Sequence, residues 1–102
     1  MIVVLGEVIA DDSSIAEVLQ ASLAHVDRSR AEPGCLSHDV ARDAHDANRL
    51  LFTERWENQA ALKDHFQVPE SGEFAGFIRR SCRGKVTLNI YQTAPASGSR
   101  GE

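Results

Sequence analysis

Apolar and polar residues alternate along four short stretches of the chain and recur at helical spacing between them. The first alternating stretch is Ile2–Ile9, where Ile2, Val4 and Val8 form one apolar face around Gly6. Alternation with β-branched residues is typical of a strand. The opposite face is also largely apolar, so we expect this strand to be covered on both sides.

A helix is predicted after the first strand. Ser14, followed three residues later by Glu17, fits a capping box. The apolar stripe that runs to about Arg30 consists of Ile15, Val18, Leu19, Ser22, Leu23 and Val26. Polar residues such as His25 fall mostly away from this stripe, and Pro33-Gly34 ends the helix.

Two alternating runs follow, Cys35–Arg42 and Arg49–Trp56, with a polar turn over 43–48 between them. This pattern predicts an antiparallel hairpin. The face of the first run that should point inward carries Leu36, His38 and Val40.

Helical segments are expected next. Asn58 can cap a short helix over 59–66, which Pro69 prevents from extending. One or two further helical turns are predicted from Gly72 to Arg80, and their inward residues are Phe74, Phe77 and Ile78.

The last predicted strand is Lys85–Gln92, which completes an ordered domain over residues 1–93. Residues 94–102 offer little to bury, and we expect them to form a flexible tail. The order strand, helix, strand, strand, helix, strand predicts an α+β, ferredoxin-like split βαβ fold, in which a four-stranded antiparallel sheet carries its helices on one face.

The predicted sheet has a second apolar face with no helix to cover it. A second copy of the chain in a two-fold dimer would cover that face. A chain of 102 residues is expected to form one domain with a core but without room for a large pocket as well. A partner subunit should therefore help to enclose any binding site.

Composition narrows the function classes. The net charge is −4, with 11 basic and 15 acidic residues, and no basic stripe suggests nucleic acid as a partner. No apolar run approaches the roughly 20 residues that cross a membrane, and residues 1–9 do not resemble a signal peptide. We therefore expect a cytoplasmic protein with no membrane partner. Cys35 and Cys82 form no disulfide framework, and reduced thiols are expected.

The segment Leu50–His65 passes from a strand, through the only tryptophan, Trp56, into a helix that ends on a histidine. Other informative motifs are Pro33-Gly34, Leu36-Ser37, Glu54-Arg55-Trp56 and Ala60-Ala61-Leu62. Together they resemble the antibiotic biosynthesis monooxygenase family, which includes quinol monooxygenases. The resemblance implies a dimeric α+β barrel that oxidises a phenol or hydroquinone with dioxygen, without flavin, haem or metal.

Three residues are candidates for catalysis. His65 matches a histidine common at that position in the family and suits a general base, although a helix-terminal histidine can equally serve structure. Trp56 offers a flat wall and an N–H donor for a phenolate, or simple core packing. Glu54 shares a face with Trp56 and is either a proton acceptor in the pocket or, as the favoured interpretation, part of an ion pair with Arg42 or Arg49.

A second group is predicted to bind the small aromatic substrate: His38, Phe52, Phe74 and Phe77. His38 is also a candidate for an ordinary core residue, because its neighbours on the strand face are apolar. The resemblance implies that no cofactor is needed. No metal is expected either, since no pair of histidines has ligand spacing on one element. In the haem-degrading branch of the superfamily that the chain resembles, a helix histidine near this position binds the iron. The segment 74–80 contains no histidine, which argues against haem degradation.

The leading hypothesis is therefore a cofactor-independent monooxygenase. The alternative is a non-catalytic dimeric module that binds or senses a small aromatic or hydrophobic metabolite. Oxygen uptake with a hydroquinone or anthrone distinguishes the two functions.

Overall fold

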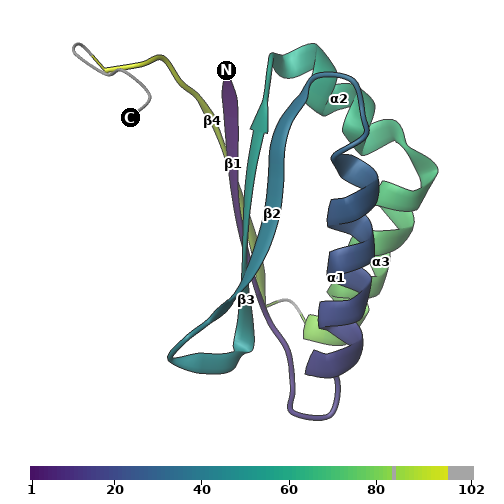
Figure 1. Ribbon diagram of the computed structural model, residues 1–102. Helices are drawn as coiled ribbons and strands as arrows, with labels where there is room; N and C mark the ends of the chain where they lie inside the picture. Colours follow the sequence, from purple (N-terminus) through teal and green to yellow (C-terminus); the bar gives the residue numbers. More distant parts are fainter. Residues whose placement is uncertain (84, 97–102) are drawn as a thin grey trace.

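The computed structural model describes residues 1–83 and 85–96, and its elements follow the predicted order (Figure 1). These are β1 (Ile2–Ile9), α1 (Ile15–Ser29), β2 (Cys35–Asp43), β3 (Asp46–Trp56), α2 (Gln59–Gln67), α3 (Pro69–Cys82) and β4 (Val86–Gln92). The strands form one antiparallel sheet in the order β2-β3-β1-β4. The fold is the predicted ferredoxin-like α+β arrangement.

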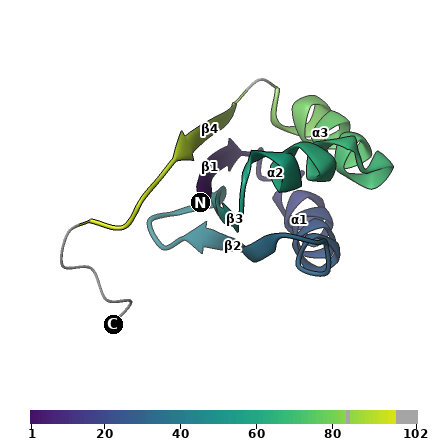
Figure 2. The same ribbon diagram turned by 90° about the horizontal axis from the view of Figure 1, so that it is seen from above.

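The helices form a single layer on one face of the sheet (Figure 2), where α1 contacts β2 and α3 contacts β1 and β4. Of the two apolar faces predicted for β1, the one formed by Ile2, Val4 and Val8 is buried, whereas Leu5 on the other face is exposed. Val8 belongs to the larger apolar cluster under α1 and α3, whereas Ile2 and Val4 pack with Trp56 and Leu62 in a second cluster nearer α2. The core is thus divided into two parts, and polar residues lie between them.

Helix α1 differs from its prediction in two respects. The capping box is wrong, because the Ser14 side chain makes no bond to the first turn and instead exchanges hydrogen bonds with the backbone of Asp11. The stripe is also rotated: Leu23 is exposed and His25 is buried. His25 was predicted to face solvent because its side chain is polar. In the structure it faces the sheet, where neighbouring polar residues contact it.

The hairpin between β2 and β3 is tighter than predicted, since only Ala44 and His45 form the turn. The inward position expected for Leu36 is wrong. A register shift between Cys35 and Ser37 makes Leu36 the extra residue of a β-bulge and leaves it exposed. Beyond the bulge the alternation resumes, and His38 is buried as predicted.

Two helical segments lead from β3 to β4. The Asn58 cap is confirmed, because its side-chain oxygen accepts the Ala61 N–H at 2.9 Å. Helix α3 starts earlier than predicted, at Pro69, where the fixed φ of proline and its missing N–H suit the first turn. Proline therefore separates two consecutive helices here and does not introduce a loop.

Strand β4 lies at one edge of the sheet, and Leu88 and Ile90 on it are about half exposed. On the face away from the helices, Leu5 and Tyr91 are also about half exposed. Residues 94–96 have no regular structure, and the rest of the predicted tail, 97–102, lies outside the described residues. In residues 1–83 and 85–96 no helix is both long and apolar enough to cross a membrane.

Candidate functional site

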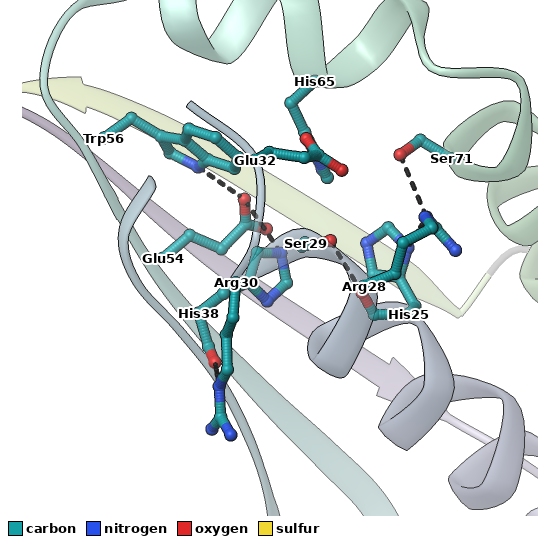
Figure 3. Close-up of polar contacts among 10 residues, drawn as sticks. All are labelled: His25, Arg28, Ser29, Arg30, Glu32, His38, Glu54, Trp56, His65 and Ser71. Carbon is teal, nitrogen blue, oxygen red and sulfur yellow. Dashed lines mark hydrogen bonds and ion pairs between the residues drawn. The ribbon is translucent and has the colours of Figure 1, made fainter. Parts of the chain in front are cut away.

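Three histidines from three different elements meet between the two parts of the core (Figure 3). His25 comes from α1, His38 from β2 and His65 from α2, and they are only 6%, 1% and 3% exposed. Their ring centroids are 5.2 to 5.6 Å apart. Strand β3 adds Glu54 and Trp56 to the same group, and the Trp56 ring lies 4.7 Å from that of His65. The predicted catalytic residues are therefore neighbours in space.

His65 is oriented by a carboxylate that sequence analysis did not single out. Its Nδ1 lies 2.7 Å from Oε1 of Glu32, which precedes the Pro-Gly turn. An ionised carboxylate can only accept, so a neutral His65 ring in this contact has its proton on Nδ1 and a lone pair on Nε2. A histidine held in this tautomer is suited to accept a proton at Nε2.

His25 has the opposite arrangement. Nη2 of Arg28, one turn further along α1, lies 2.8 Å from His25 Nδ1 and also donates to Ser71 Oγ. A guanidinium has no acceptor, so Nδ1 of His25 must accept and a neutral ring carries its proton on Nε2. Phe74 stacks on the ring at a centroid distance of 4.2 Å and an angle of 11°.

The charge state of His25 follows from its surroundings. Burial is the main cause, followed by repulsion from His38 and His65, and together they lower the pKa of His25 from 6.5 to about 3. His25 is therefore a neutral donor throughout the physiological pH range.

Glu54 is buried, and no arginine within residues 1–83 and 85–96 forms an ion pair with it. Its Oε1 accepts the Trp56 Nε1–H at 2.9 Å and lies 3.3 Å from His38 Nε2. Burial raises the pKa of Glu54, but the contacts with His38 and Trp56 outweigh this effect and hold the pKa below its usual range. The predicted ion pair with Arg42 or Arg49 is wrong, because Arg49 binds Glu7 and Asp43.

A cavity of about 400 Å³ opens beside this group, between the sheet and the helices. Of the predicted site residues, it is lined by Phe52, Glu54, His65 and Phe74, and His25 joins them. Trp56, His38 and Phe77 do not line the cavity. Trp56 is completely buried behind Glu54, so its geometry suits holding that carboxylate rather than stacking on a ligand.

Sequence analysis missed His25, Arg28 and Glu32. Spacing along one element could not reveal a group that forms only when α1, β2 and α2 pack together. A weak signal was present for His25 and Arg28, which are three residues apart and therefore lie on one face of a helix. The two cysteines lie outside this group, and burial raises the pKa of each thiol, so reactive thiolates are disfavoured at neutral pH.

These features define a class: a small ferredoxin-like α+β domain with an apolar cavity and a buried group of histidines and carboxylates. The sequence profile described as "Antibiotic biosynthesis monooxygenase" matches residues 1–76. The chain belongs to the antibiotic biosynthesis monooxygenase family, as its sequence motifs suggested.

The chain is also similar to individual proteins and solved structures. The chain is 40% identical over 93 residues to "Uncharacterized protein sll1783" of Synechocystis, covering 91% of this chain and 63% of that protein. It is 32% identical over 73 residues to "Putative monooxygenase YcnE" of Bacillus subtilis, covering 72% and 70%. A crystal structure of an antibiotic biosynthesis monooxygenase superimposes with a TM-score of 0.84 at 26% identity, covering 93% of this chain and all of that one.

Proposed function

We propose that the protein is a cofactor-independent monooxygenase that oxidises a phenolic or hydroquinone-type aromatic substrate with dioxygen. The observation that supports this most directly is the Glu32–His65 pair, because a neutral His65 ring bonded through Nδ1 keeps a lone pair on Nε2, and His65 lines a cavity whose other walls are largely apolar. A hydroxyl proton can be taken up there beside a space suited to an aromatic ring.

The proposed reaction balances without a cofactor. His65 takes the hydroxyl proton, and the phenolate gives one electron to dioxygen. The resulting superoxide and phenoxyl radical combine at a ring carbon and receive the proton from His65 to form a hydroperoxide. Loss of the proton on that carbon and cleavage of the O–O bond then give a quinone and water. One oxygen atom enters the product, and the phenol supplies all four electrons.

Other side chains have supporting roles in this proposal. His25 donates its Nε2–H to the phenolate oxygen, the kind of fixed donor that stabilises a developing oxyanion. Phe52 and Phe74 form apolar walls that exclude water. Glu54, held by Trp56, keeps a negative charge near the imidazolium that forms on His65. Phe77 packs against the core cluster, and we assign it no role in binding.

Oxygen uptake by the purified full chain tests the proposal, with a panel of hydroquinones and anthrones as substrates. His65→Ala should reduce kcat at least about tenfold, the low side of a general-base contribution. Glu32→Gln should also reduce kcat, because a neutral amide stabilises the imidazolium less well. His45→Ala is the matched control, since the His45 side chain is 97% exposed in the hairpin turn. Equal rates for His65→Ala and His45→Ala would refute the assignment of His65 as the general base.

The alternative function, a binding or sensing module, makes a different prediction. Aromatic ligands would then change the emission of Trp56, whose ring lies 4.7 Å from the cavity-lining His65, without any oxygen uptake. Saturable binding with no turnover across the panel would favour this alternative.

We also propose that the protein forms a homodimer. The sheet face away from the helices exposes Leu5 and Tyr91. Leu88 and Ile90 at the β4 edge are also exposed, and Leu88 lines the cavity. A second copy would bury these residues and close the cavity. The cytoplasmic location remains a prediction from sequence.

A further inference from the structure

The three buried histidines have a geometry that their proposed roles in catalysis do not explain. One ring nitrogen from each of His25, His38 and His65 lies within 4.8 Å of the others. The rings approach from a helix, a strand and a second helix, so they surround a common point. Imidazole nitrogens are common ligands of zinc, copper, nickel and iron, and three histidines with an open fourth position form the zinc site of known enzymes.

His38 provides an independent indication that this point binds a ligand. It is 1% exposed, and neither of its ring nitrogens makes a hydrogen bond within residues 1–83 and 85–96. Its Nε2 lies 3.3 Å from Glu54 Oε1, which is an ion-pair distance without hydrogen-bond geometry, and its Nδ1 has no hydrogen-bond partner among the described residues. Leaving a buried polar group without a partner costs about 1–3 kcal/mol, so a fold rarely retains one without a reason.

We propose that His25, His38 and His65 bind one divalent transition-metal ion. Glu32 is the outer carboxylate that orients His65, as carboxylates commonly do for metal-bound histidines. Because metal–nitrogen bonds of about 2.0–2.1 Å place tetrahedral ligands about 3.4 Å apart, the three side chains must move toward one another by small rotations.

Arg28 opposes this binding. Its donor to His25 Nδ1 requires the proton of that ring on Nε2, whereas a neutral imidazole that binds metal through Nε2 needs the proton on Nδ1. Arg28 must therefore leave Nδ1 before His25 becomes a ligand. Replacing Arg28 by methionine, which has similar length and no donor, should tighten metal binding.

The inference also predicts an effect on the proposed reaction. A metal ion on His65 occupies the lone pair that would accept the substrate proton. Binding of the ion and base catalysis by His65 then exclude each other, and the ion acts as an inhibitor. This consequence rests on the proposed function, whereas metal binding itself does not.

Titration of the chelator-treated full chain with Co²⁺ and Zn²⁺ tests the inference. Calorimetry should give one ion per protomer, Co²⁺ should develop visible absorption, and Co²⁺ should quench Trp56, the only tryptophan. His38→Phe, which keeps a ring in the core, should weaken binding at least tenfold. Glu32→Gln should weaken it about 10–100-fold, as is typical of outer carboxylates. His45→Ala should leave it unchanged.

Arg28→Met is the variant that distinguishes a lost ligand from a misfolded protein. It should bind the metal ion more tightly, and a damaged fold would weaken metal binding instead. Absence of stoichiometric binding to both the natural chain and Arg28→Met would overturn the inference, as would binding lost in His45→Ala but retained in His38→Phe.

Oxygen uptake by the metal-free protein separates this inference from the proposed function. Turnover that added Zn²⁺ inhibits supports both. Metal binding without metal-free turnover supports the site and refutes the cofactor-independent reaction. Metal-free turnover with no metal binding refutes only the site.

Discussion

Replacing His25 by asparagine should make the stability of the protein less sensitive to acid. The ring of His25 is almost completely buried, and its pKa falls from 6.5 to about 3 on folding. Asparagine places an oxygen near the position of Nδ1, so Arg28 keeps an acceptor, but the titrating group is lost. Comparing the natural chain with His25→Asn therefore isolates the effect of protonating the His25 imidazole on stability.

The size of the effect follows from linkage. Since the folded pKa is below the unfolded value, only the unfolded chain binds a proton at His25 between about pH 6.5 and pH 3. The stabilisation is complete above pH 6.5 and decreases as the pH falls. Each pH unit below the unfolded pKa removes about 1.36 kcal/mol, so the loss of stability from pH 7.5 to pH 5.0 is about 2 kcal/mol. The loss of about 2 kcal/mol is the same for any folded pKa below about 4.

Urea unfolding at fixed protomer concentration measures this effect, with the emission of buried Trp56 as the signal. Between pH 7.5 and pH 5.0, the natural chain should lose about 2 kcal/mol more of its unfolding free energy than His25→Asn. Acidic groups such as Glu54 are present in both proteins, and their contributions largely cancel. His45→Asn, which removes an exposed histidine, should behave like the natural chain. Parallel pH profiles for the natural chain and His25→Asn would refute the assignment of a buried neutral imidazole.

Three further substitutions test other parts of the structure. Trp56→Phe should lower the unfolding free energy by about 2 kcal/mol, because the buried Glu54 carboxylate loses a charged hydrogen bond. Urea unfolding followed by circular dichroism measures this loss. An unchanged unfolding midpoint would show that the hydrogen bond is not stabilising. Gly34→Ala should lower the unfolding free energy by about 1–3 kcal/mol, because alanine is strained at a φ of 81°. The new Cβ would also lie 2.5 Å from the Cβ of Ala61. An unchanged melting temperature would contradict this geometry. Leu5→Glu should convert the proposed dimer to monomers in sedimentation velocity, whereas a persistent dimer would place the interface elsewhere.

The sheet was predictable because its signals are local. Alternation grouped Ile2, Val4 and Val8 on one face of the first strand, which is the buried face, and Asn58 caps its helix as predicted. Errors arose where tertiary contacts override a local rule. Pro69 was interpreted as a stop although it also suits the first turn of a helix, and the bulge at Leu36 cannot be recognised from alternation alone.

The site was only partly predictable for the same reason. His65, Trp56 and Glu54 lie close together in sequence, and the strand-to-helix connection keeps them close in space. Glu32 and His65 are 33 positions apart, and only the packing of α2 against the Pro-Gly turn brings them into contact. A pattern that repeats every two or four residues contains no information about such a pair.

The two histidines nearest the cavity carry their protons on opposite nitrogens because their partners differ in charge. Glu32 leaves a lone pair on His65, whereas Arg28 leaves an N–H on His25. A hydroxyl group that reaches both rings can give its proton to His65 and, once ionised, accept a hydrogen bond from His25. A metal ion needs lone pairs on both rings, and His25 offers one only after Arg28 leaves its Nδ1. The cation at Arg28 therefore favours an oxyanion over a metal, and removing it should shift the preference of the site in the opposite direction.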